Sequence, residues 1–355
     1  MPLDTSSFGL PVELPKVSAQ LKKLWETEGQ TKSRASILNF AVIGQSADKL
    51  AENTQLISQL VREHACRAFV VGTAPGAHPT ISAWIQAHCH LTKAGARQIC
   101  SEQVTLLAEG CSEEAYAHAL LSHLDYDLPL TLWWQGELPE QPRSALWPAV
   151  DRLIFDSGEW SNFSQQLTAL HRTRQGHSRG MIWADLNWTR TLAMRQALAQ
   201  CYDTPDCLPH LSQIKTVRIE HSPESQRTAL LLGCWLAAQL GWTATESSHS
   251  HVDFRSRSHA PVRLELRAKP GAPLSSIFLE SSDFQIFVSR HSGTSLLRAD
   301  IRKNNILVRE SSFSAGPADV LGLLSAEMIP GSRHPVYQRA LSIAQAIPGQ
   351  IFRAP

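Results

Sequence analysis

The sequence predicts two domains, an α/β domain followed by an α+β domain. Over residues 34–175, short apolar strand patterns alternate with helix patterns, which is typical of a mostly parallel sheet flanked by helices. Over residues 250–310, strand patterns follow one another at short intervals with turn signals between them, which predicts an antiparallel meander. The length of 355 residues also suits two hydrophobic cores better than one.

The boundaries follow from the same patterns. We expect an N-terminal arm at 1–33, an α/β domain at 34–175, an α+β domain at 181–330 and a C-terminal helix and tail at 331–355. In the first domain the strand patterns lie at 36–43, 67–72, 81–91, 97–110, 128–134 and 152–157, with helix patterns at 47–64 and 112–124. In the second domain, helix patterns at 185–201 and 225–240 flank a strand at 214–221 before the meander begins.

Composition excludes several classes of protein. The formal net charge is +1, so no overall field favours nucleic acid or an anionic membrane. The apolar run "TALLLGCWLAAQL" is too short to span a bilayer, and the N-terminus lacks the pattern of a signal peptide. Seven cysteines form no framework spacing, which favours a reducing compartment. We therefore expect a cytoplasmic protein that binds neither nucleic acid nor membrane.

The motifs that could carry catalysis are weak. "GHSRG" at 176–180 matches a nucleophile elbow, but no strand precedes it, so Ser178 is not expected to be a nucleophile. Gly72 and Gly76 follow a strand, yet Pro79 and another strand come next instead of the helix that a phosphate loop needs. The sequence therefore predicts no catalytic residue and no cofactor.

The cysteines and histidines also give no metal site. In the alternating strand 81–91, Cys89 points to the apolar face, while His88 and His90 point away from it, so the three cannot share one ion. Cys201 and Cys207 flank the turn "YDTPD" and are the candidates for a reversible disulfide, with free, partly buried thiols as the alternative.

Charge and aromatic residues are unevenly distributed. Residues 101–160 carry 11 acidic and 2 basic side chains, whereas residues 251–310 carry 6 acidic and 10 basic ones. Oppositely charged surfaces steer and orient protein partners, although two such surfaces can also face each other within one chain. Several tryptophans lie within residues 133–188. Tryptophan is enriched both at interface hot spots and in protein cores. Trp133 and Trp134 are candidates for partner contact.

The segment "DLNWTRTLAMRQAL", residues 185–198, combines these features in one helix. Asp185 can cap its N-terminus, and Trp188 and Arg195 are spaced so that they share one face. This face is either a partner-binding surface or a buried strut. We mark Asp185, Trp188, Arg190 and Arg195 as candidates for partner contact.

Five blocks in a fixed order resemble a known family. They are "DLPLTLWWQGELP", "LWPAVDRLIFDS", "DLNWTRTLAMRQALAQCYD", "IKTVRIEH" and "LLLGCWLAAQLGW". Together they resemble the glucose-6-phosphate dehydrogenase assembly protein family, OpcA. The resemblance implies a non-catalytic activator of glucose-6-phosphate dehydrogenase. It also implies thioredoxin-type redox control, with thioredoxin as a further partner. The alternative is an enzyme or sensor that binds a sugar phosphate or nucleotide at the strand ends of the α/β domain.

Overall fold

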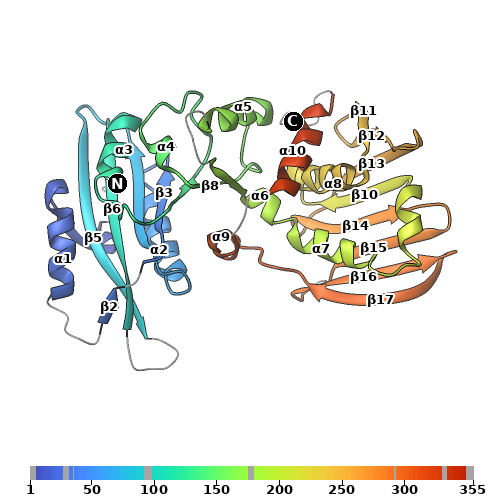
Figure 1. The fold of residues 1–355 in the computed structure, drawn as a ribbon, viewed down its shortest axis with the longest axis horizontal. Helices are drawn as coiled ribbons and strands as arrows, with labels where there is room; N and C mark the ends of the chain where they lie inside the picture. Colours follow the sequence, from blue (N-terminus) through green and yellow to red (C-terminus); the bar gives the residue numbers. More distant parts are fainter. Residues whose placement is uncertain are drawn as a thin grey trace. The chain divides into compact units, whose positions relative to one another are not determined.

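The computed structural model describes residues 5–26, 32–34, 36–91, 98–174, 180–291, 293–329 and 334–348. The chain forms two compact units (Figure 1). The first contains residues 1–160, 165–184 and 320–332, and the second contains residues 161–164, 185–319 and 333–355. The helix at 320–328 therefore belongs to the first unit, although the strands that precede it belong to the second.

The described residues of the first unit form a nine-stranded sheet. Its strands, in spatial order, are β1 (Leu10–Val12), β5 (Thr80–Leu91), β6 (Gln98–Glu109), β4 (Arg67–Ala74), β3 (Asn39–Gly44), β7 (Leu130–Trp134), β8 (Arg152–Phe155) and β9 (Ile182–Asp185), while β2 (Lys32–Arg34) pairs with β6. The pairs from β6 through β4, β3 and β7 to β8 are parallel, whereas β1–β5 and β5–β6 are antiparallel. The predicted mostly parallel sheet is confirmed.

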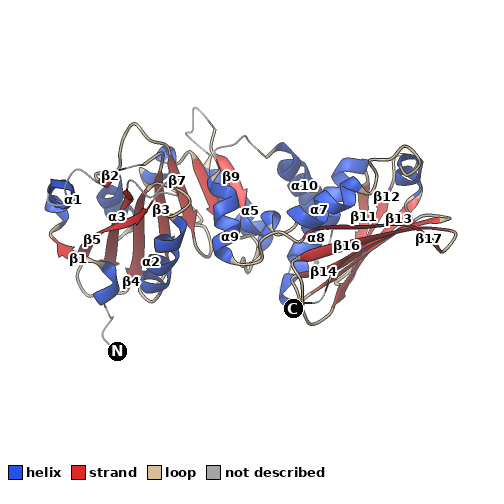
Figure 2. Ribbon diagram, turned by 90° about the horizontal axis from the view of Figure 1, so that it is seen from below, coloured by secondary structure: helices blue, strands red, loops and turns tan. Residues whose placement is uncertain are grey.

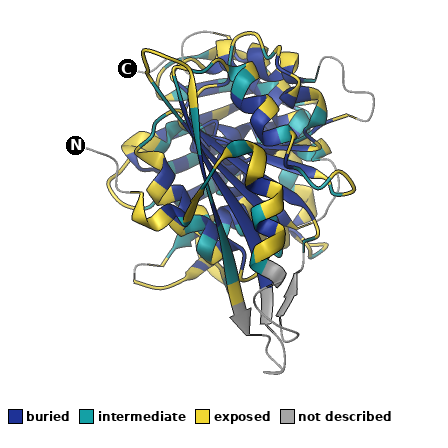
Figure 3. Ribbon diagram, turned by 90° about the vertical axis from the view of Figure 1, so that its left-hand side faces the viewer, coloured by how far each residue is buried: buried dark blue, intermediate teal, exposed yellow. Residues whose placement is uncertain are grey.

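Burial explains the composition of these strands. Every residue of β3, β7 and β8 is buried, as expected for parallel strands covered on both faces. Figure 3 shows these buried strands behind more exposed helices. The helices of this unit are α1 (Val17–Glu26), α2 (Lys49–Leu60), α3 (Glu113–Leu121), α4 (Leu146–Ala149), α5 (Phe163–Thr173) and α9 (Val320–Met328).

The second unit contains an eight-stranded sheet. The order is β11 (Thr243–Ser247), β12 (His251–Arg255), β13 (Pro261–Ala268), β10 (Thr216–His221), β14 (Leu274–Glu280), β15 (Phe284–Arg290), β16 (Leu296–Lys303) and β17 (Ile306–Ser314). The pair β10–β13 is parallel and the other neighbouring pairs are antiparallel. The predicted antiparallel sheet is therefore confirmed, but not as one continuous meander, because β10 lies between β13 and β14.

Helices cover one face of this second sheet (Figure 2). They are α6 (Leu186–Thr189), α7 (Leu192–Gln200), α8 (Gln226–Leu240) and α10 (Pro335–Ala346). Alternate residues of the strands point toward these helices and are buried, for example Val217 and Ile219 in β10. The residues between them, such as Arg218, lie on the opposite, open face of the sheet. Within the described residues, no helix is long and apolar enough to cross a bilayer.

Candidate functional site

The segment 185–198 begins as the sequence predicts. Asp185 ends β9 and caps α6, because its side chain accepts a hydrogen bond of 2.9 Å from the backbone N–H of Asn187. The predicted continuous helix over 185–201 is wrong, since α6 ends at Thr189 and α7 begins at Leu192. The hydroxyls of Thr189 and Thr191 donate to the carbonyls of Asp185 and Trp188, and such bonds compete with regular helix geometry.

Asp185 is fully buried within a polar cluster. The phenol of Tyr337 in α10 donates a 2.8 Å hydrogen bond to its carboxylate. The next residue but one, Asn187, accepts a 2.5 Å hydrogen bond from the hydroxyl of Thr228 in α8. A buried carboxylate is stable only when such donors replace water. Asp185 therefore serves to join the start of the segment to α10.

Trp188 and Arg195 share a face, as predicted. The guanidinium carbon of Arg195 lies 3.7 Å from the centre of the Trp188 ring, which places the cation over the aromatic face. The Nε of Arg195 donates to the hydroxyl of Thr191 over 2.8 Å, which holds the guanidinium in this position. The centre of the Trp188 ring also lies 5.3 Å from the centre of the Tyr337 ring.

Burial divides the predicted partner-contact residues into two sets. Only 4% of Trp188 is exposed and Asp185 is buried, so neither side chain can be reached by a partner in this structure. This agrees with the buried-strut alternative. Arg190 and Arg195 are half-buried, and 39% of the neighbouring Leu192 is exposed. These three residues form an accessible edge of the segment, where Gln196 is exposed as well.

Trp133 and Trp134 also belong to the core. Both lie in the fully buried strand β7. The indole N–H of Trp134 donates to the carbonyl of Glu137 over 2.8 Å, and its ring lies 5.2 Å from that of Trp147. These contacts assign a packing role to both residues.

The redox candidates are separate thiols. Cys201 and Cys207 are both buried and free, and the hydroxyl of Thr204 donates to the sulfur of Cys207. Burial raises the pKa of the Cys201 thiol to about 11, which disfavours the reactive thiolate. The free-thiol alternative therefore describes this pair.

The disulfide of this structure joins two other cysteines, Cys89 and Cys100. The two residues lie directly opposite each other on the antiparallel strands β5 and β6, with a Cα–Cα distance of 4.1 Å. The sequence placed Cys89 on the inward, apolar face of its strand, whereas Cys89 is exposed and bonded to Cys100 in the structure. This bond was missed because the sequence patterns identified both strands but not their pairing.

At the carboxyl end of β3, side chains of the chain itself lie close to the backbone. There the side chains of Asn53 and Gln135 exchange two hydrogen bonds of 2.8 and 2.9 Å. A Cβ on Gly44, the last residue of β3, would lie 2.9 Å from the Gln135 side-chain oxygen, so the side chains leave little space beside the backbone. Gly72 lies within β4, and the loop with Gly76 leads into β5 rather than into a helix, as predicted. A phosphate cradle is not formed by this loop.

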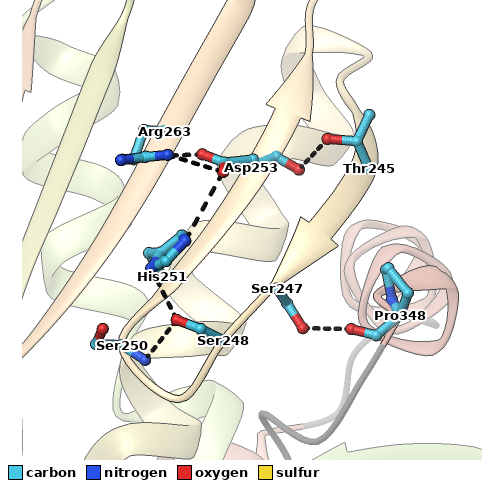
Figure 4. Close-up of polar contacts among 8 residues, drawn as sticks. All are labelled: Thr245, Ser247, Ser248, Ser250, His251, Asp253, Arg263 and Pro348. Atoms are coloured by element: carbon cyan, nitrogen blue, oxygen red, sulfur yellow. Dashed lines mark hydrogen bonds and ion pairs between the residues drawn. The ribbon is translucent and has the colours of Figure 1, made fainter.

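One group of side chains resembles a catalytic triad in composition (Figure 4). The hydroxyl of Ser248 lies 2.7 Å from Nδ1 of His251, whose Nε2 lies 3.8 Å from the Asp253 carboxylate. That carboxylate accepts two hydrogen bonds from Arg263, which lower the pKa of Asp253. Because Asp253 is held by Arg263 and is beyond hydrogen-bond distance of His251, the group does not have triad geometry.

Ser178 lies outside the described residues. Within the described part of the chain, no three His, Cys, Asp or Glu side chains are grouped so that they could hold a metal ion.

Comparison with known sequences identifies similar proteins for both units. A family model described as the glucose-6-phosphate dehydrogenase subunit N-terminal domain matches residues 57–174, and the corresponding C-terminal domain model matches residues 182–341. A protein of Nostoc punctiforme named "Putative OxPP cycle protein OpcA" is 26% identical over 235 residues, covering 63% of this chain and 50% of the relative. A protein of the same name from a Synechocystis species is 23% identical over 230 residues, covering 62% and 48%. The chain thus matches about half the length of these curated relatives.

Comparison with solved structures also gives matches, at low sequence identity. Biliverdin reductase from Synechocystis matches with a TM-score of 0.45 and 10% identity, over 88% of this chain and 99% of that one. UDP-N-acetylglucosamine 3-dehydrogenase GnnA from Acidithiobacillus ferrooxidans matches with a TM-score of 0.44 and 11% identity, over 90% and 100%.

Proposed function

Because this chain belongs to the OpcA family of glucose-6-phosphate dehydrogenase subunits, we propose that it assembles with that dehydrogenase and activates it by protein–protein contact. The observation that carries the proposal is the match of both subunit domain models, which together span residues 57–174 and 182–341 in the expected order. In this proposal the chain catalyses no reaction of its own.

The structure of the strand ends supports this role over the alternative. A sugar phosphate or nucleotide would bind at the carboxyl ends of the parallel strands. There the reciprocal hydrogen bonds between Asn53 and Gln135 satisfy the amide groups that a ligand would otherwise use. A bound ligand would have to break these two hydrogen bonds, and their loss would weaken its binding.

We place partner contact on the accessible edge of the segment 185–198. Arg190, Leu192 and Arg195 are the residues of that edge, and the buried Asp185 and Trp188 hold it in position. Arginine next to exposed apolar surface is a common composition for an interface. The buried residues in this proposal act on partner binding indirectly.

The proposal is tested by titrating purified chain onto glucose-6-phosphate dehydrogenase from the same organism. We expect a rise in dehydrogenase activity and a heavier complex by light scattering, and a Leu192→Asp variant that weakens both. Gln226→Ala, which removes an exposed hydrogen bond elsewhere in the second unit, is the matched control. Unchanged activity and no complex would disprove the proposal.

Two further arms address the remaining possibilities. Repeating the titration under oxidising and reducing conditions measures whether redox state, and hence a thioredoxin-type reductant, alters the activation. Thermal stabilisation of the isolated chain by glucose 6-phosphate or NADP⁺ would favour the ligand-binding alternative.

A further inference from the structure

The second sheet has a face that no helix covers within the described residues, and we call it the open sheet face. It consists of the outward-pointing residues of β10 and β12–β17 (Figure 2). Its strands are five to nine residues long. With strands about 4.8 Å apart and a rise of about 3.3 Å per residue, the open sheet face covers roughly 800 Å². A standard interface buries about 800 Å² on each partner.

The centre of the open sheet face is aromatic. Phe278 in β14 and Phe287 in β15 lie directly opposite each other, with ring centres 6.5 Å apart. Phe287 is 38% exposed, although phenylalanine is ordinarily buried. A shallow depression of about 230 Å³ lies beside the two rings and is lined by Phe278, Gln285, Phe287, Asp300 and Arg302.

More apolar surface adjoins this centre. Leu296, at the start of β16, is 44% exposed, and Leu307 in β17 is 45% exposed. Leu307 pairs with Arg302, which belongs to the open face. An apolar centre with charged residues around it is the usual composition of a protein–protein interface.

The charges around the aromatic centre are nearly balanced. Six arginines and six carboxylates of the strands point outward: Arg218, Arg255, Arg263, Arg267, Arg298 and Arg302, with Glu220, Asp253, Glu265, Glu280, Asp300 and Glu310. Lys269, directly after β13, also lies 3.4 Å from Glu220. Many are paired across the sheet, for example Arg218 with Glu265 at 3.1 Å and Arg298 with Asp300 at 2.8 Å. A neutral face of mixed sign suits a partner with the same pattern better than a strongly charged one.

The register of the strands places opposite charges symmetrically about the centre of the face. One row across the sheet reads Arg218, Phe278, Phe287, Asp300 on β10, β14, β15 and β16. The row beside it reads Glu220, Ser276, Ser289, Arg298 on the same strands. In both rows the charges at the two ends are opposite in sign and equally far from the line between β14 and β15.

We propose that the open sheet face binds the same face of a second copy of this chain, about a two-fold axis that runs along the strands between β14 and β15. This rotation places β10 of one copy over β16 of the other. Arg218 then faces Asp300 of the second copy, Glu220 faces its Arg298, and the aromatic pairs meet at the centre. Such an interface is isologous, because each contact occurs twice.

The carboxylates of Glu265 and Glu310, on the outer strands of the face, are compatible with this dimer. Glu265 and Glu310 would face each other between copies, but each is already bound to arginines of its own copy. Glu265 accepts from Arg218 and Arg267, and Glu310 lies 3.0 Å from Arg298. These ion pairs reduce the repulsion between the two carboxylates.

The test uses two charge reversals, Glu220→Arg and Arg298→Glu, in the full chain. Wild type is expected at twice 39.3 kDa by light scattering, and each variant alone is expected to dimerise at least about tenfold more weakly. An equimolar mixture of the two variants should recover the dimer, because each reversed residue then faces an opposite charge. Arg143→Glu, an exposed change in the first unit, should leave the wild-type dimer intact.

A third variant, Phe287→Glu, tests the aromatic centre and should also give monomer. Circular dichroism of every variant establishes that the fold is retained. Monomeric wild type at all concentrations would overturn the proposal, as would failure of the mixed variants to recover the dimer. Loss of dehydrogenase binding in Phe287→Glu, together with monomeric wild type, would assign the face to the dehydrogenase instead and would also overturn it.

Discussion

The guanidinium of Arg195 lies 3.7 Å from the centre of the Trp188 ring and covers an otherwise buried aromatic face. The contact joins the two short helices α6 and α7 across their break at Arg190 and Thr191. A cation over a tryptophan ring contributes about 1 kcal/mol when it is partly exposed. The same arginine belongs to the edge that we propose as the contact with the dehydrogenase.

Replacing Arg195 with methionine keeps most of the side-chain volume but removes the cation. We expect the free energy of unfolding, measured with urea, to fall by about 1 kcal/mol. Arg195→Lys should recover part of this loss, because the charge returns without the planar guanidinium. An Arg195→Met variant as stable as wild type would show that the cation contributes nothing to this packing.

The hydrogen bond between Tyr337 and Asp185 predicts a larger effect. Tyr337→Phe leaves the buried carboxylate without its 2.8 Å phenol donor, and hydrogen bonds to charged groups contribute about 2 kcal/mol. We expect urea unfolding to show a loss of this size and the proposed activation of glucose-6-phosphate dehydrogenase to decrease with it. Tyr126→Phe removes the hydroxyl of an exposed tyrosine and should change neither quantity.

The two helices also show how far the sequence could predict this site. The Asp185 cap and the shared face of Trp188 and Arg195 were predictable, because capping and helical spacing are local properties. Tyr337 is 152 residues from Asp185 along the chain, and no local pattern links the two. Whether Trp188 would be buried or would contact a partner depended on that distant residue.

The strands of the first sheet were likewise predictable from local patterns, but their pairing was not. The alternation over 81–91 predicted one strand with its inward face, and β5 extends from Thr80 to Leu91. Its antiparallel pairing with β6 was not predicted, because alternation defines faces but not neighbours. Without that pairing, Cys89 and Cys100 could not be recognised as partners.

The Cys89–Cys100 disulfide leads to a prediction about stability. The two cysteines are 11 residues apart in the sequence, and a cross-link closing a loop of this size stabilises a fold by about 3 kcal/mol. Cys89→Ala should therefore lower the melting temperature under oxidising conditions. In excess dithiothreitol, wild type and variant should melt at nearly the same temperature.

Cys111→Ser is the matched control, because Cys111 is a free cysteine that is only half-buried. It should melt like wild type whether or not dithiothreitol is present. Mass spectrometry after alkylation reports directly whether Cys89 and Cys100 are linked. Equal melting temperatures of wild type and Cys89→Ala in the oxidised state would contradict the prediction.

Histidines of the first unit predict how stability depends on pH. Burial lowers the pKa of His64, His88, His123 and His171 below the usual value of 6.5. For His88, the charge of Arg62 also lowers the pKa, while a 2.9 Å hydrogen bond with Gln103 partly opposes the shift. The folded state therefore binds fewer protons than the unfolded state as pH falls below 6.5.

Since the unfolded state gains the extra protons, the free energy of unfolding should be greatest above pH 6.5 and should fall as pH drops through the lowered pKa values. Urea unfolding between about pH 5 and pH 7.5 measures this slope. His88→Gln removes one titrating group and should make the slope shallower. NMR titration of His88 in the folded chain provides the direct comparison, and a midpoint at or above 6.5 would show that burial does not control its protonation.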